Sequence, residues 1–180
     1  MQITTLSTRR GEVTIRPSRE ADAEAYRELR LAGLQAHPEV FGADYASSAA
    51  QPIEHWRERA RRGAGGEHGI TYFAETGGEL VGVTVLMRDE SPKLRHTGYL
   101  VSVYVMPGWR GLGIADSLIE ACLGWGHALG LRLVRLSVVT SNMAAIRSYA
   151  RLGFTVYGIE PEAIAYDGAY YDELLMFRRL

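Results

Sequence analysis

One feature constrains the fold of this chain more than any other. A glycine-rich turn joins a segment rich in β-branched and aromatic residues to a long amphipathic segment. The turn and its flanks read Val103-Tyr104-Val105-Met106-Pro107-Gly108-Trp109-Arg110-Gly111-Leu112-Gly113-Ile114-Ala115. Beyond it, apolar residues recur at helical spacing to about Leu129. The pattern predicts a strand that turns directly into a helix.

Such a turn can bind an anion. The first N–H groups of a helix lack acceptors within the helix, and the helix dipole adds partial positive charge there. Phosphate is the usual ligand of this arrangement. Gly111 and Gly113 carry no side chain that would keep a ligand from the backbone, and Arg110 can add charge. We therefore expect a phosphate site at residues 110–115.

Two common nucleotide motifs do not fit this turn. A P-loop requires a Gly-Lys-Ser/Thr ending, which is absent. The dinucleotide pattern requires glycine or alanine where this chain has Asp116, whose carboxylate would also stand near a pyrophosphate. The pattern that remains is Arg/Gln-x-x-Gly-x-Gly/Ala, which Arg110, Gly113 and Ala115 satisfy.

That pattern resembles the signature of the GCN5-related N-acetyltransferase (GNAT) superfamily. Two linked motifs carry the resemblance. The family's Val-x-Pro-x-x-Arg-Gly-x-Gly motif is matched by Val105, Pro107, Arg110, Gly111 and Gly113. Its later Asn-x-x-Ala, Tyr and Gly-Phe positions are matched by Asn142, Ala145, Tyr149, Gly153 and Phe154. The chain is identified as similar to small bacterial-type members, strongly over residues 103–154 and elsewhere by element order.

The resemblance implies a cosubstrate and the residues that bind it. Acetyl-CoA would place its pyrophosphate on the turn and its pantetheine arm along the preceding strand, beside a bulge that separates this strand from the next parallel one. Asn142 would contact the arm. The implied binding residues are Val103, Tyr104, Val105, Arg110, Gly111, Leu112, Gly113, Ile114, Ala115, Asn142 and Tyr149. No metal is implied.

The implied reaction is direct attack of a primary amine on the thioester in a ternary complex. A backbone N–H near Val103 would stabilise the charge that develops on the carbonyl oxygen. Tyr149 would be the general acid, since a phenol with an ordinary pKa of about 10 is protonated at neutral pH. A buried core tyrosine is the alternative interpretation of Tyr149, and a helix N-cap is that of Asn142.

The general base and the acceptor are less defined. Glu90, His96 and Tyr104 lie on or near the central strands, although a surface histidine is the simpler interpretation of His96. An amine that arrives neutral, or a water chain, would need none of them. The acceptor is expected to be a small-molecule or peptide amine. Its specificity segments contain His37, Pro38, Glu39, Val40, Phe41, Gly42, Tyr45, Trp56, Tyr166, Tyr170 and Tyr171.

Hydrophobic periodicity predicts strands at 12–16, 70–75, 80–88, 94–105, 131–139, 154–158 and 172–180, and helices at 21–35, 53–62, 111–129 and 142–152. Residues 41–51 are expected to be a loop. The fold class is α/β: a mixed, twisted sheet with helices packed on it. The resemblance implies a single GNAT domain of about six to seven strands, splayed at the central parallel pair, and about four helices.

A chain of 180 residues fits one domain. Within it we expect a loose leader at 1–11, an acceptor-side and hairpin half at 12–100, an acetyl-CoA-binding core at 101–158 and a terminal hairpin at 159–180.

Composition sets the remaining expectations. A net charge of −1 favours neither nucleic acid nor a membrane surface as partner. The single cysteine, Cys122, is expected in the core, and a cytoplasmic location is the simplest setting. A homodimer is allowed by analogy. The alternatives left open are an acyl-CoA-binding sensor without turnover, another acyl donor and a hydroxyl acceptor.

Overall fold

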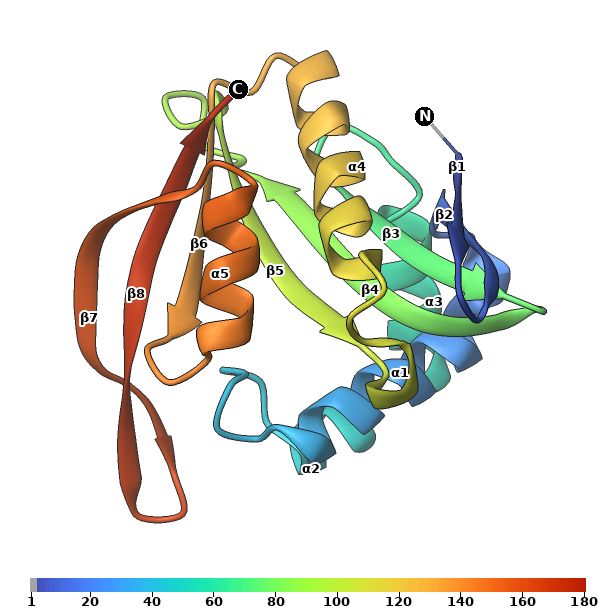
Figure 1. The fold of residues 1–180 in the computed structure, drawn as a ribbon, viewed down its shortest axis with the longest axis horizontal. Coiled ribbons are helices and arrows are strands. Elements are labelled where there is room, and N and C mark those ends of the chain that lie inside the picture. Colours follow the sequence, from blue (N-terminus) through green and yellow to red (C-terminus); the bar gives the residue numbers. More distant parts are fainter. Residues whose placement is uncertain (1–2) are drawn as a thin grey trace.

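An eight-stranded mixed sheet, in the order β1-β2-β3-β4-β5-β6-β8-β7, organises the computed structural model, which describes residues 3–180 (Figure 1). The strands are β1 (Thr4–Thr8), β2 (Gly11–Pro17), β3 (Gly69–Thr76), β4 (Glu79–Arg88), β5 (Thr97–Val105), β6 (Leu133–Val139), β7 (Thr155–Tyr166) and β8 (Ala169–Arg179). The helices are α1 (Ala23–Ala36), α2 (Tyr45–Ala49), α3 (Ile53–Arg62), α4 (Ile114–Ala128) and α5 (Met143–Arg151).

The two faces of the sheet bury separate apolar clusters. On one face, Leu118, Ile119 and Cys122 of α4 pack with residues of the central strands. On the other face, Tyr26 of α1 and Trp56 of α3 form the second cluster. Strand side chains alternate between faces, and β3, β4 and β5 each contribute to both clusters. The α/β prediction is therefore confirmed, and so is a core position for Cys122.

The sheet is antiparallel except at one pair of strands. Strands β5 and β6 run parallel, and their pairing covers only Thr97–Tyr99 with Leu133–Arg135. Beyond that point β5 continues to Val105 and β6 to Val139 without pairing to each other. The two strands separate in Figure 1, and the predicted splay is present.

A bulge in β5 lies just before the glycine-rich turn. Val83 of β4 pairs with Tyr104, but Val85 pairs with Val101, so Ser102 and Val103 together face one residue of β4. Ser102 has a positive φ of 59°. Bulged residues leave the regular hydrogen-bond ladder, so this stretch of backbone has polar groups outside it.

The N-terminal segment corrects one prediction. Residues 4–8, expected within a loose leader, form β1, which pairs antiparallel with β2 from Thr4↔Ile15 to Thr8↔Gly11. Leu6 packs on the α4-side core. One apolar side chain among polar ones is a weak strand signal, because a strand at the edge of a sheet needs little burial. The first two residues of the predicted leader lie outside the described range.

The element counts also exceed the prediction, with eight strands and five helices among residues 3–180. Helix α2 lies inside the predicted loop 41–51 and is capped by Asp44, whose Oδ1 accepts a hydrogen bond of 2.7 Å from the Ser47 amide. The last two strands form one extended hairpin (Figure 1), in which β7 runs to Tyr166 instead of ending near residue 158 and β8 begins at Ala169 instead of residue 172. Register shifts after Val156 and Glu160 interrupt its periodicity. None of the described helices is long and apolar enough to cross a membrane.

Candidate active site

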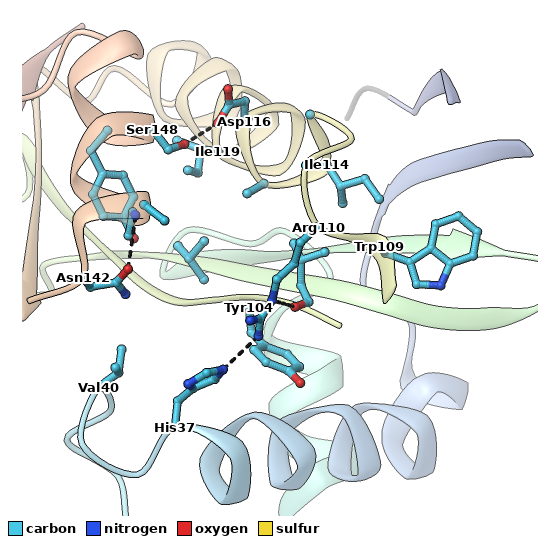
Figure 2. A pocket seen from close by; sticks show the side chains of 18 of the residues that line it. His37, Val40, Tyr104, Trp109, Arg110, Ile114, Asp116, Ile119, Asn142 and Ser148 are labelled. Carbon is cyan, nitrogen blue, oxygen red and sulfur yellow. Dashed lines mark hydrogen bonds between the residues drawn. The ribbon is translucent and has the colours of Figure 1, made fainter. Parts of the chain in front are cut away.

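A pocket of about 660 Å³ opens where β5 and β6 separate (Figure 2). Three segments line it: the end of α1 with the residues after it, the strand-turn-helix segment from Val103 to Ile119, and the start of α5. Every predicted binding residue except Leu112 lines this pocket. Leu112 instead packs against the α4-side core. The fold thus brings together two motifs that are distant in the sequence.

The glycine turn has a backbone shape that favours glycine. Gly111 and Gly113 have φ of 71° and 77°, in the left-handed region. A Cβ added at either position would meet no other atom within 4 Å, so crowding by the protein is not the reason for glycine there. Gly113 precedes the first turn of α4 and provides no side-chain cap. The backbone N–H groups in the first turn of α4 therefore bind no capping side chain. The residues of that turn, Ile114 to Asp116, line the pocket.

Asp116 lies in the first turn of α4, and residues of α5 bind its side chain. Its carboxylate accepts a hydrogen bond from the Ser148 hydroxyl (Figure 2). It also accepts one of 3.1 Å from Arg151 Nη2. Both partners belong to α5. The negative charge expected to oppose a pyrophosphate is thus engaged with α5, and it ties the two helices together beside the pocket.

Tyr149 and Asn142 occupy the α5 side of the pocket. Tyr149 is 7% exposed and packs edge-on against Phe154, and burial raises the pKa of its phenol. A raised pKa keeps the phenol protonated well above neutral pH, as a proton donor must be. Asn142 is the N-cap of α5: its Oδ1 accepts from the Ala145 amide at 3.2 Å (Figure 2).

Arg110 does not extend toward the amides of the turn. Its Nε donates to the Val105 carbonyl at 3.0 Å, and its Nη2 lies 2.9 Å from Nε2 of His37 (Figure 2). A guanidinium can only donate, so His37 Nε2 is the acceptor and the imidazole carries its proton on Nδ1. That nitrogen lies 3.9 Å from Oε1 of Glu39. Arg110 therefore joins the turn to the segment that follows α1.

The structure changes the candidates for general base. Glu90 and His96 do not line the pocket. Glu90 lies 3.5 Å from both Arg62 and His68 on the surface, and His96 precedes β5 at the end of the strand far from the bulge. Tyr104 does line the pocket, as do His37 and Glu39. Sequence reasoning assigned those two only to the acceptor segment, because nothing local shows that the end of α1 reaches the turn.

The predicted acceptor-side aromatics separate into two groups. Phe41 lines the pocket, whereas Tyr45, Tyr166, Tyr170 and Tyr171 do not. Trp56 is fully buried in the second core, as its core interpretation predicted.

Comparison with known proteins agrees with this architecture. Residues 26–154 match the model of the acetyltransferase (GNAT) family. The L-amino acid N-acetyltransferase AaaT of Escherichia coli K12 is 27% identical over 173 residues, which span 93% of this chain and 98% of that protein.

Solved structures show the same fold. An acetyltransferase of the GNAT family from Streptococcus pneumoniae superposes with a TM-score of 0.83 at 24% identity, covering 93% of this chain and 99% of the other. A putative acetyltransferase from Salmonella typhimurium, determined with its cofactor acetyl-CoA, gives a TM-score of 0.79 at 22% identity, covering 93% and 94%.

Proposed function

This chain belongs to the acetyltransferase (GNAT) family, and on that premise we propose that it transfers the acetyl group of acetyl-CoA to a primary amine by direct attack in a ternary complex. One observation carries the proposal. The glycine turn, the β5 bulge and the buried phenol of Tyr149 all border a single pocket. An anion site, free backbone in an open strand and a proton donor are the groups that acetyl transfer requires.

The pocket fits the parts of acetyl-CoA in order. The amides at the start of α4 suit the pyrophosphate, and no side chain stands over Gly111 or Gly113. Val103–Val105 lies beyond the last β5–β6 pair, so those of its backbone groups that neither β4 nor Arg110 uses are available to the amide groups of a pantetheine arm. Bound there, acetyl-CoA supplies the activated acetyl group.

The chain's own residues then take three roles. The backbone N–H of the bulge near Val103 donates to the thioester carbonyl oxygen as charge develops on it. The protonated phenol of Tyr149 gives its proton to the departing thiolate. Glu39 accepts the proton of the incoming ammonium, directly or through water. The position of Glu39 supports this role, because Glu39 lines the pocket. The neighbouring His37 is a poorer candidate, because its Nε2 is already bound by Arg110.

We place the acceptor among small-molecule amines. The named activity of the E. coli relative, on L-amino acids, supports this class. Amines should enter from the side of His37, Val40 and Phe41, since the opposite side belongs to the phosphate turn.

The test is turnover by the purified protein. Acetyl-CoA is incubated with primary amines and with matched alcohols, thiol release is followed, and products are identified by mass. We expect amines, not alcohols, to be acetylated, with intersecting double-reciprocal plots, as a ternary complex requires. A protein that binds acetyl-CoA but acetylates no amine is a sensor, and preferential esterification of the alcohols would make the acceptor a hydroxyl.

A further inference from the structure

A buried cation without an acidic partner lies behind the acceptor side of the pocket. Arg30, in the middle of α1, is 6% exposed. Its Nη1 is buried and has no hydrogen-bond partner among residues 3–180, and no described carboxylate forms an ion pair with it. A charge removed from water without a counter-ion is costly, so such a group calls for an explanation.

The surroundings of Arg30 increase this cost. Burial lowers the pKa of Arg30 to about 10; Tyr26 opposes this shift in part, and the positive charge of Arg59 adds to it. The side chain therefore remains a cation at neutral pH. Arg59 itself donates to the hydroxyl of Tyr26 at 3.2 Å and supplies no negative charge. An anion is the group that this environment lacks.

Arg30 is one side chain away from the pocket. Its guanidinium carbon lies 4.5 Å from the ring centroid of Phe41, and Phe41 lines the pocket. Arg30 lies on α1, seven positions before His37, the residue that caps the C-terminal end of this helix. His37 also lines the pocket. The Phe41 ring thus separates the cation from the space that the acceptor enters.

We propose that Arg30 binds the carboxylate of the amine acceptor after the Phe41 side chain moves aside, which makes α-amino acids and related amino carboxylates the substrate class. The planar guanidinium suits a carboxylate, because two parallel N–H groups can bind its two oxygens. This inference rests on the proposed function, since it assigns the acceptor of the same reaction.

The experiment compares acceptors that differ only in charge. L-alanine, L-leucine and L-phenylalanine are each paired with their carboxamides. For at least one pair we expect kcat/KM to be about 10- to 100-fold higher for the acid, the usual range for a hydrogen bond to a charged group. Arg30→Met should abolish this preference and leave the KM for acetyl-CoA unchanged. Arg30→Lys, which keeps the charge, should retain part of it.

Arg27 provides the matched control. It lies on the same helix and its Nη2 donates to the Ala49 carbonyl at 3.0 Å, while its buried Nε, like Nη1 of Arg30, has no hydrogen-bond partner among residues 3–180. Arg27→Met removes a comparable side chain and should leave the acid-to-amide ratio unchanged. The inference is overturned if the wild-type protein uses carboxamides as well as acids in all three pairs. It is also overturned if Arg30→Met keeps the ratio, or if Arg27→Met lowers it equally.

A binding measurement separates this inference from the proposed function. Calorimetry with N-acetyl-L-leucine and N-acetyl-L-leucinamide, in the presence of CoA, requires no turnover. Tighter binding of the acid that is lost in Arg30→Met supports the assignment even if no amine is acetylated. Acetylation of amines without any preference for a carboxylate leaves the proposed function intact and refutes the role of Arg30.

Discussion

At the scale of single residues, the burial of Tyr149 decides what its hydroxyl can do. The side chain is 7% exposed, and burial raises the pKa of the phenol because the phenolate would lose hydration. The neutral form therefore persists above the ordinary range of tyrosine. The same burial also explains why sequence reasoning could not separate a core tyrosine from a general acid: the side chain packs on Phe154 and lines the pocket.

Removal of this hydroxyl should slow the chemical step. We expect Tyr149→Phe to lower kcat by about 10²- to 10⁴-fold, the usual contribution of a general acid, with little change in the KM for acetyl-CoA. In the wild-type protein, loss of activity from ionisation of Tyr149 should appear only above its ordinary pKa of about 10, because the shift is upward. A pH–rate profile of both proteins measures this. An unchanged kcat in Tyr149→Phe would remove the residue from the mechanism.

Glu39 is proposed to accept a proton from the amine, whereas Tyr149 is proposed to donate one to the thiolate. Glu39→Gln keeps the shape of the side chain but cannot accept a proton, so kcat/KM for the amine at neutral pH should fall by about 10²-fold or more. The deficit should shrink as pH rises, because more of the amine is then neutral in solution. His37→Ala is the comparison, since it removes the Arg110 contact but leaves the carboxylate. A deficit independent of pH contradicts the base assignment.

At the scale of elements, periodicity was informative wherever an element has a buried face. The predicted helix 53–62 coincides with α3, and the hairpin at Gly77-Gly78 joins β3 to β4 as expected. The prediction was wrong for β1 and α2 and too short for β7 and β8. β1, α2, β7 and the first residues of β8 are largely exposed, so their side chains carry little periodic signal.

The candidate site was also predictable only in part. The turn and α5 carry motifs, and the structure places both at one pocket. The contribution of α1 was not predictable, because His37 meets Arg110 across 73 positions of sequence and no local pattern encodes that contact. Arg30 likewise reads as an ordinary polar position until its burial is known.

The turn at the start of α4 can be tested against the turn at its end. Gly113 and Gly130 have φ of 77° and 81°, and an added Cβ at either position meets no other atom within 4 Å. Valine at either position should cost about 1–3 kcal/mol of folding free energy, because that backbone conformation is strained for a β-branched residue. Only Gly113→Val should also weaken CoA binding, by an expected 10-fold or more. Calorimetric titration with CoA checks this, and equal affinities in the two variants would exclude the turn as the pyrophosphate site.

At the scale of the whole molecule, the sheet is two blocks that meet along a short seam. Strands β1 to β5 form one block and β6, β8 and β7 the other, and only three residue pairs join β5 to β6. A ligand that bridges the open part of the seam contacts both blocks in the folded protein and neither in the unfolded chain. Its binding energy therefore adds to the stability of the fold.

Thermal unfolding measures that contribution. Acetyl-CoA at about 100 times its Kd should add about 2.7 kcal/mol, which corresponds to a rise in Tm of roughly 5–10 °C for a domain of this size. Free pantetheine, which lacks the pyrophosphate, measures the contribution of the arm at the same concentration. Dephospho-CoA, which keeps the pyrophosphate, adds the contribution of the anion site together with that of the adenosine. No rise with acetyl-CoA at saturating concentration would contradict a pocket that spans the seam.

The short seam also has a mechanical consequence. We expect the softest motion of such a molecule to be a change in the angle between the two blocks, because few strand hydrogen bonds oppose it while many stiffen each block internally. A cosubstrate laid along Val103–Val105 acts as a temporary strand and makes the sheet stiffer for as long as it stays. Each catalytic cycle would then alternate between a compliant and a rigid body, and release of CoA would restore the opening through which the next molecule enters.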